Sequence, residues 1–270
     1  MRIVTLVENT EGGSGCIAEH GLCIYIETQK HKLLMDSGQT DACVKNAQKL
    51  GIDLSAVDTL ILSHGHYDHS GGILPFSKLN GKARIIMHAK APEPHYNMDK
   101  YIGIDKDILK LPDIEFIEND KTLDDELFLF TSVTGRRCFP KGNLRLKMIK
   151  DGEKVCDDFS HELFLVISQC GKKFLLSGCA HNGILNILDR YKEIFGSFPD
   201  HVISGFHMMK REGEHDEDEI AVIRQTAAEL SRLDTVFYSG HCTGQPAFDI
   251  MKSIMGDKLR AIHSGDEISI

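Results

Sequence analysis

Three histidines and an aspartate directly follow one short apolar segment, and this arrangement constrains the chain more than any other feature. Thr59–Ser63 has the length and composition of a buried β-strand, and the next six residues read His-Gly-His-Tyr-Asp-His. In an extended backbone His64 and His66 point to the same side, whereas Asp68 and His69 come after the chain turns. Imidazole and carboxylate groups are ligands of divalent first-row metals. One loop could therefore supply two ligands to each of two neighbouring ions.

The alternative is a polar surface loop that holds three histidines by chance. The chain has 14 histidines among 270 residues, so this pattern arises by chance about once in three hundred chains of this composition. Gly65, Gly71 and Gly72 leave room for tight turns and close backbone approach. Metal binding is therefore the expected role of the loop.

Charge and composition exclude several classes of protein. Lys and Arg number 31 against 40 Asp and Glu, which gives a formal net charge of −9. Such a chain is a poor candidate for binding nucleic acid or an anionic membrane. No apolar run approaches the roughly 20 residues of a membrane-spanning helix, and Glu8 interrupts the first apolar segment too early for a secretory signal. We expect a cytoplasmic protein, and the sequence makes no prediction of its oligomeric state.

The eight cysteines include no Cys-x-x-Cys pair. This argues against a zinc ribbon, a thioredoxin-type site and a ferredoxin-type cluster. In a cytoplasmic protein they are expected to be reduced thiols.

Hydrophobic periodicity predicts one domain over residues 1–270, with sheets inside and helices outside. A hairpin is predicted first, with its turn at residues 28–31, and further strands follow. The predicted strands are Leu22–Glu27, Lys32–Asp36, Thr59–Ser63, Ala83–Met87, Ile114–Ile117, Leu127–Thr131, His161–Ser168, Lys173–Ser177, Val202–Ser204, Thr235–Ser239 and Ile268–Ile270. The predicted helices are Thr40–Leu50, one starting at Asn182, Asp216–Ser231 and Pro246–Met255, and Arg136–Lys154 is expected to be a loop.

The histidine-rich loop resembles the hallmark of the metallo-β-lactamase superfamily. Other stretches resemble one branch of it, the dihydropterin-ribofuranosylaminobenzene-phosphate synthase-like metal-dependent hydrolases. These stretches are Glu19–Leu22, Leu34–Gln39, Thr134–Gly135, Leu176–Ile184, Gly205–His207 and Gly240–Gly244. The resemblance implies an α/β (α+β) fold, a four-layer αββα sandwich, and a dinuclear metal site. Zinc is the expected metal, with iron or manganese as alternatives.

Further ligands are expected where later strands end. His181 and His241 each follow a predicted strand and are predicted to complete the two sites. Cys179 stands where most of the superfamily has a bridging aspartate. Two alternatives stay open: its thiolate binds metal, or it lies behind the ligands.

Roles for the remaining candidates are also predicted. Asp68 would bind an ion and orient the nucleophile, and His207 would act as a general acid or donate to substrate, with metal ligation as the weaker alternative. Asp36 would either orient a ligand histidine or cap a turn. His20, in the branch-like stretch, is expected to contact substrate. His88 and His95 are reserve ligands, and a structural role is expected for His31, His161, His201, His215 and His263.

The predicted function is metal-dependent hydrolysis of an ester or phosphoester in a small molecule. The branch adds a synthase-type transfer and a phosphoribosyl or pterin-related substrate. A basic run predicts a site entrance that attracts a phosphate group, with Arg136 and Arg137 as the predicted substrate-binding residues and a solvated loop as the alternative. The run consists of Arg136, Arg137, Lys141, Arg145, Lys147, Lys150 and Lys154. The alternatives are a di-iron redox protein and a non-catalytic metal- or ligand-binding protein on the same fold.

Overall fold

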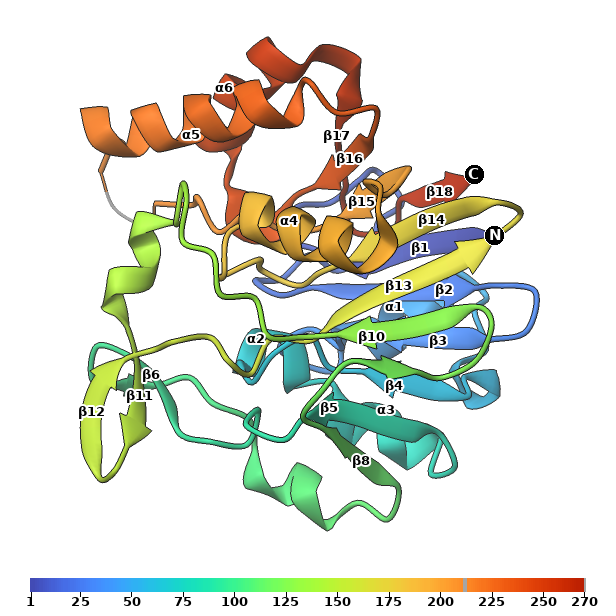
Figure 1. Ribbon diagram of the computed structural model, residues 1–270. Coiled ribbons are helices and arrows are strands. Elements are labelled where there is room, and N and C mark those ends of the chain that lie inside the picture. Colours follow the sequence, from blue (N-terminus) through green and yellow to red (C-terminus); the bar gives the residue numbers. More distant parts are fainter. Residues whose placement is uncertain (211–212, 270) are drawn as a thin grey trace.

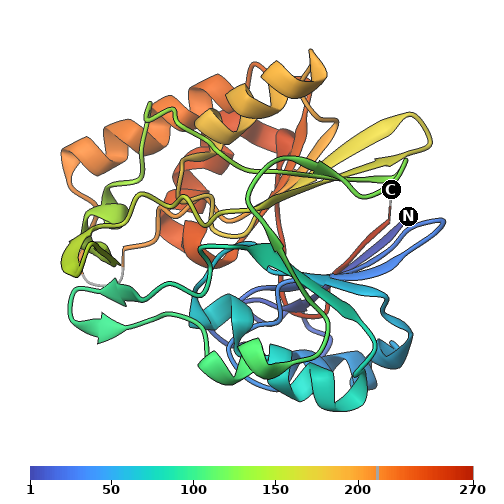
Figure 2. The ribbon, with the colours of Figure 1, turned by 60° about the horizontal axis from the view of Figure 1, so that its bottom comes forward.

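Two seven-stranded sheets stack face to face, with helices on both outer faces (Figures 1 and 2). The computed structural model describes residues 1–210 and 213–269. The first sheet has the order β18-β1-β2-β3-β4-β5-β8. Its strands are β1 (Arg2–Val7), β2 (Cys23–Glu27), β3 (Lys32–Met35), β4 (Thr59–Ile61), β5 (Arg84–His88), β8 (Ile114–Ile117) and β18 (Glu267–Ser269).

The second sheet has the order β17-β16-β15-β14-β13-β10-β9. Its strands are β9 (Lys121–Thr122), β10 (Leu127–Phe130), β13 (Phe164–Gln169), β14 (Lys172–Leu176), β15 (His201–Ile203), β16 (Val236–Ser239) and β17 (Leu259–Ala261). A small third sheet contains β6 (His95–Asn97), β7 (Lys100–Tyr101), β11 (Leu146–Lys150) and β12 (Glu153–Cys156).

The helices are α1 (Ala42–Lys49), α2 (Tyr67–Ser70), α3 (Ile73–Leu79), α4 (Ile184–Phe195), α5 (Glu217–Leu230) and α6 (Gln245–Met255). Short 3₁₀ turns cover Leu54–Ala56, Lys106–Lys110, Lys141–Arg145, His241–Thr243 and Gly256–Lys258. None of the helices in the described ranges is long and apolar enough to cross a membrane.

Three apolar layers hold the sandwich together. Successive side chains of a strand point to opposite faces of its sheet: Ile24 packs between the two sheets, whereas Tyr25 packs under α1 and α3. In the second sheet, Leu176 likewise faces the other sheet, and Leu175 packs against α4–α6. This is the expected αββα arrangement, so the predicted fold class is confirmed.

One predicted loop was wrong. Arg136–Lys154 contains β11, and the chain then turns into β12. Asp151 and Gly152 make the turn with φ of 53° and 83°, as an Asp-Gly type I′ hairpin turn requires. The many lysines of this segment resemble those of a solvated loop, so the hairpin signal of Asp151 and Gly152 was overlooked. Strands β1, β6, β7, β9 and β17 and helices α2 and α3 were not predicted, and Ile270 lies outside the described residues.

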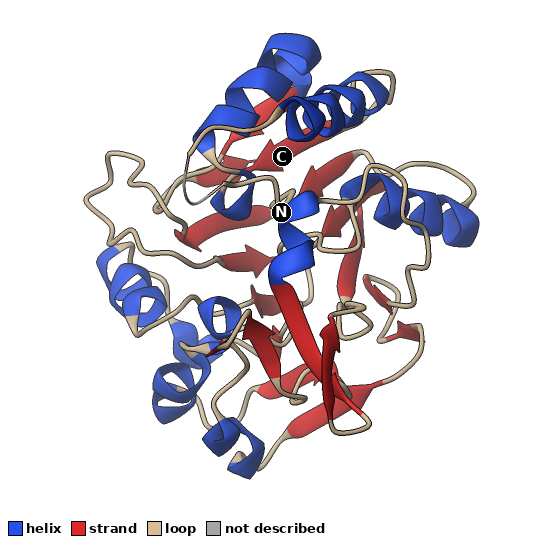
Figure 3. Ribbon diagram, turned by 90° about the vertical axis from the view of Figure 1, so that its left-hand side faces the viewer, coloured by secondary structure: helices blue, strands red, loops and turns tan. Residues whose placement is uncertain are grey.

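The strand directions bring many chain segments to one edge of the sandwich. β3, β4 and β5 are parallel, β1 runs the same way, and β14 to β17 are parallel in the other sheet. Their carboxyl ends meet at the edge where the small sheet lies, which faces the viewer in Figure 3. Ligands of α/β proteins commonly bind at such an edge.

Candidate metal centre

Three histidines from both sheets form the first candidate ligand set. His64 and His66 follow β4, and His181 follows β14. His64 Nε2 lies 3.3 Å from His181 Nε2. The His66 ring lies 4.5 Å from the His64 ring and 4.9 Å from the His181 ring, between centroids. All three side chains are buried.

The second set lies directly beside the first. His69 Nε2 is 3.1 Å from His241 Nε2, and Asp68 Oδ2 is 3.6 Å from the same His241 atom. Cys179 Sγ lies 3.2 Å from His69 Nε2 and is also within 4.8 Å of the ligating atoms of His64 and His181. The cysteine therefore lies between the two sets.

These spacings fit metal binding. Two nitrogens bound to one tetrahedral zinc ion at about 2.0–2.1 Å lie roughly 3.4 Å apart. The two Nε2–Nε2 distances of 3.3 and 3.1 Å match that value. Nitrogen, carboxylate and thiolate ligands suit zinc and related first-row metals.

Hydrogen bonds fix the tautomers of four of these histidines. Asn143 donates its amide N–H to the His181 carbonyl, so its Oδ1, 3.0 Å from His181 Nδ1, accepts that ring proton. Asn9 holds His241 in the same way, with 2.9 Å between Oδ1 and Nδ1. The protons on Nδ1 leave the Nε2 lone pairs to face the metal sites.

Asp36 fixes the other two tautomers. Its Oδ2 lies 2.6 Å from His69 Nδ1 and accepts that ring proton. The same oxygen accepts the Ser63 hydroxyl, so Ser63 Oγ accepts from His64 Nδ1 at 2.8 Å. Oriented rings of this kind are typical of metal ligands.

Buried carboxylates hold the two ligand loops of the second sheet. Glu162 accepts the backbone N–H of His181 at 2.7 Å and that of Asn182 at 2.9 Å. Glu8, after β1, accepts the backbone N–H of His241 at 2.5 Å. A Cβ at Gly178 would overlap Ser63 Oγ, so only glycine lets the two ligand loops approach each other.

Several site residues have unusual backbone conformations. Asp36, Ala180, His207 and His241 have φ of 61°, 53°, 50° and 49°. Left-handed conformations of non-glycine residues are costly, and they cluster at functional sites. Each of these four residues lies shortly after the end of a strand, where the chain turns its side chains towards the centre.

Burial and crowding determine the ionisation of the centre. Burial is the main cause of a lowered pKa in four histidines, and neighbouring imidazoles add to it: His64, His66, His181 and His241. Burial also lowers the pKa of His69, but Asp36 and Asp68 outweigh it and raise the pKa to about 9. Burial raises the pKa of Asp68, but His69 and a hydrogen bond from His20 hold it well below the usual range. Neutral imidazoles beside an ionised carboxylate are ready to bind a cation.

A cavity of about 520 Å³ opens above the centre. His66, Asp68 and His181 are part of its wall, as are segments of the small sheet and α5. Four cationic side chains also line it: Lys100, Lys141, Arg145 and Lys210. Lys141 pairs with Asp218 and Lys210 with Glu219, whereas Arg145 makes no ion pair within the described ranges. The chain is acidic overall, but this entrance is basic.

The structure brings some of the remaining predicted residues to this cavity and not others. His20 lines it, with Nε2 3.1 Å from Asp68 Oδ2. His207 lines it too, with its ring 4.1 Å from that of His181. Arg136 instead bonds to Asn182 and the Asp158 carbonyl, and Arg137 pairs with Asp189 and Glu229. Neither arginine is among the described residues on the cavity wall.

Sequence reasoning missed the residues that orient the ligands. Asn9, Ser63 and Asn143 carry no motif of their own, although Asn9 and Ser63 each follow a strand that ends at the site. Lys100 was also missed as a cavity residue, because it comes from the small sheet, whereas Lys141 and Arg145 of the predicted basic run do line the cavity.

Comparison with known proteins decides the family. The model of the metallo-β-lactamase superfamily matches residues 17–135. Uncharacterized protein MJ0448 of Methanocaldococcus jannaschii is 32% identical over 217 residues, which cover 77% of this chain and 79% of the relative. The crystal structure of Tm1679, described as a metal-dependent hydrolase of the β-lactamase superfamily, covers 100% of this chain at 31% identity with a TM-score of 0.85, and 99% of its own chain is matched. The chain belongs to the metallo-β-lactamase superfamily.

Two further relatives refine that assignment. A 7,8-dihydropterin-6-methyl-4-(β-D-ribofuranosyl)-aminobenzene-5'-phosphate synthase of the same organism is 26% identical over 285 residues, covering 98% of this chain and 95% of the synthase. YhfI from Bacillus subtilis, at 15% identity and a TM-score of 0.58 over 99% of this chain and 98% of its own, shares the metallo-β-lactamase fold. The resemblance predicted from the sequence is thus confirmed at the level of superfamily and fold, and a superfamily of metal-dependent hydrolases implies divalent metal ions in the centre described above.

Proposed function

We propose that this protein is a metal-dependent hydrolase with a dinuclear centre, acting on an ester or phosphoester bond of a small anionic molecule. The observation that carries the proposal is the set of four imidazoles whose Nε2 lone pairs converge in two neighbouring pairs. His64 and His181 would hold one ion together with His66, and His69 and His241 would hold the other together with Asp68. Zinc is the metal we expect.

Divalent ions bound there supply Lewis acidity and lower the pKa of water, so that a nucleophile exists near neutral pH. The chain's own residues would do the rest. The ionised Asp68 carboxylate would accept a hydrogen bond from the attacking water and orient it. His20, 3.1 Å from Asp68 Oδ2, would fix that carboxylate. His207, on the cavity wall beside His181, would donate a proton to the leaving oxygen.

The basic entrance supports an anionic substrate. The synthase relative is named for a compound with a ribofuranosyl 5'-phosphate, so phosphorylated ribosides are the first compounds to assay. Arginine and lysine side chains at the mouth of a cavity attract and orient phosphate groups. A synthase-type transfer at the same centre would use the same activation of a phosphate-bearing substrate.

Elemental analysis of protein purified without chelator tests the metal centre. About two zinc, manganese or iron ions per chain are expected in the native protein, and fewer in Asp68→Ala and His181→Ala. His215→Ala is the matched control, because His215 lines the same cavity but bonds to the Met208 carbonyl; it should keep both ions. Folded protein that takes up no metal on titration would contradict the proposal of metal-dependent catalysis.

A further inference from the structure

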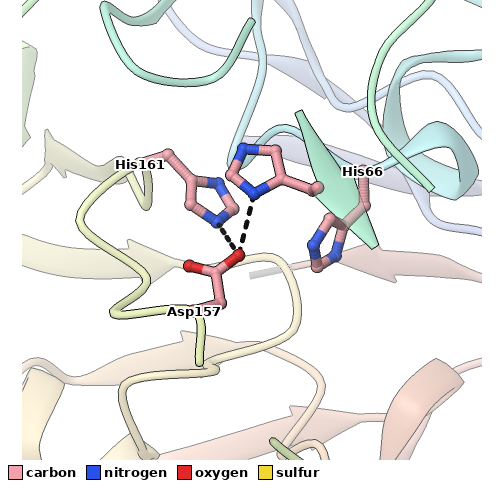
Figure 4. Close-up of side chains that lie close together, drawn as sticks. His66, Asp157 and His161 are labelled. Carbon is pink, nitrogen blue, oxygen red and sulfur yellow. Dashed lines mark hydrogen bonds and ion pairs between the residues drawn. The ribbon is translucent and has the colours of Figure 1, made fainter. Parts of the chain in front are cut away.

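A second buried cluster lies directly behind His66. Asp157, His95 and His161 each have a ligand-type atom within 4.8 Å of one another and of a ring nitrogen of His66, and all four residues are buried (Figure 4). The His66 ring lies 5.6 Å from the His95 ring and 5.5 Å from the His161 ring. The ring of His66 therefore neighbours the rings of His64 and His181 in the candidate metal centre, while its ring nitrogen groups with this cluster.

Hydrogen bonds show where the protons of the cluster lie. Gly65 donates its backbone N–H to His161 Nδ1 at 3.0 Å, so the neutral His161 ring carries its proton on Nε2, which faces Asp157 Oδ2 at 3.4 Å. His95 Nδ1 lies 2.8 Å from the same oxygen and donates to it. A cation at His161 Nε2 would need the lone pair that this tautomer lacks. The cluster is thus a carboxylate that accepts a hydrogen bond from His95 and faces the Nε2 N–H of His161, rather than a third metal site.

His66 differs from the other candidate ligand histidines in its own hydrogen bonding. His64, His69, His181 and His241 each have an oxygen acceptor beside Nδ1, as described above. His66 Nε2 is buried and has no hydrogen-bond partner among the described residues. A buried polar nitrogen without a partner costs stability. A metal-binding histidine almost always donates its second ring N–H to a carboxylate, a carbonyl or water.

We propose that Asp157, held by His95 and His161, is the positioning residue of His66: it accepts the second ring N–H of His66 when the other ring nitrogen binds metal. This role rests on the dinuclear centre proposed above. It also links the centre to the small sheet, because His95 begins β6 and Asp157 directly follows β12. The same sheet contributes Lys100 and Leu146 to the cavity wall. The small sheet would therefore position both the residues that contact substrate and the residues that orient His66.

Metal titration of Asp157→Asn and Asp157→Ala tests the role. We expect each variant to lose affinity for one of two ions by about 10–100-fold, as mutations of such outer partners do, while the second ion binds as in the native protein. The cobalt-substituted variants should show a changed visible spectrum for that one ion, and kcat should fall with little change in KM. Asp158→Asn is the matched control, because the Asp158 carboxylate bonds to the neighbouring Ser160 N–H and not to the cluster.

His95→Gln provides a second variant if Asp157 cannot be replaced without unfolding. It keeps the carboxylate but removes the imidazole that donates to it, so a smaller loss of affinity at the same ion is expected. Two ions bound with native affinity in all folded variants would overturn the positioning role and leave the dinuclear proposal standing. A native protein holding three ions, one of them lost in Asp157→Asn, would show that the cluster binds a cation itself. A native protein that binds no metal would overturn both proposals.

Discussion

At the scale of single residues, the candidate site depends on which side chain accepts the second ring proton of each histidine. Asn9 and Asn143 each use both ends of one amide to fix one histidine, and Asp36 fixes two, His69 directly and His64 through Ser63. Imidazole nitrogens buried and crowded together are costly unless a cation or another partner occupies the space between them. That cost is the physical reason to regard the cluster as a metal centre rather than a packed core.

Cys179 is the residue whose role the sequence left open. Its Sγ is 3.2 Å from His69 Nε2, which places it at ligand distance, and we predict that its thiolate binds metal. The cobalt-substituted native protein should then show a sulfur-to-cobalt absorption that Cys179→Ala lacks. Cys23→Ala is the control, because Cys23 is a buried free thiol in the apolar layer under the first sheet and is in none of the candidate ligand groups that the described residues form. An unchanged spectrum in Cys179→Ala would place the thiol behind the ligands.

At the scale of elements, the small sheet does more than cover the edge. Its hairpin β11–β12 and the 3₁₀ turn Lys141–Arg145 carry cavity residues, and its strand β6 carries His95. The hairpin lies in the segment that the sequence predicted as a loop. The strands of this hairpin carry many charged side chains, so their hydrophobic pattern is weak. The Asp-Gly turn between them is the stronger sequence signal for a hairpin.

Two arginines of the predicted basic run differ in the structure, because Arg145 lines the cavity and Arg137 is not among the described residues of its wall. Arg145→Ala should raise KM for a phosphorylated substrate by roughly tenfold, since a charge-assisted contact contributes about 1.5 kcal/mol or more. Arg137→Ala should leave KM unchanged, because Arg137 is already paired with Asp189 and Glu229. Steady-state kinetics with a phosphomonoester or phosphodiester check this. The opposite result would support the sequence-based prediction that Arg136 and Arg137 bind the substrate.

At the scale of the whole molecule, contacts between the two sheets hold the halves of the centre together. Besides the apolar layer between them, the turn after β2 reaches the other sheet: His31 Nε2 lies 2.6 Å from Asp124 Oδ2, and Thr28 Oγ1 donates to Glu126. His31 Nδ1 also lies 3.3 Å from Asp58 Oδ1. These links lie far from the metal centre, so they affect stability without changing its chemistry.

The His31 contacts predict a pH-dependent stability. Burial lowers the pKa of His31, but the hydrogen bond that its ring donates to Asp124 and the charge of Asp58 outweigh it, and the pKa is raised. A raised histidine pKa contributes stability that is fully present below the unfolded value of about 6.5 and is lost as pH rises through the folded value. The Tm difference between native protein and His31→Gln should therefore shrink from pH 6 to pH 9.

Lys30→Gln is the control for this pH series. Lys30 lies in the same turn as His31 and pairs with exposed Asp125, which lies between β9 and β10. Neither group changes its charge between pH 6 and 9. Its Tm difference from the native protein should therefore stay constant. A His31→Gln difference that is also constant would show that His31 does not titrate with folding.

The sequence by itself determined the candidate ligand loop, most helices and strands, and the family, because those signals lie within a few residues of one another. Its prediction that Asp36 orients a ligand histidine also came from local position, at the end of a strand. Only the tertiary structure decided which residues hold the rings, because Asn9 is 232 positions from His241 and Asp157 is 62 positions from His95. Partners this far apart in the chain form no sequence motif of fixed spacing. Hydrogen bonds between distant segments form only where the fold brings their ends to one edge.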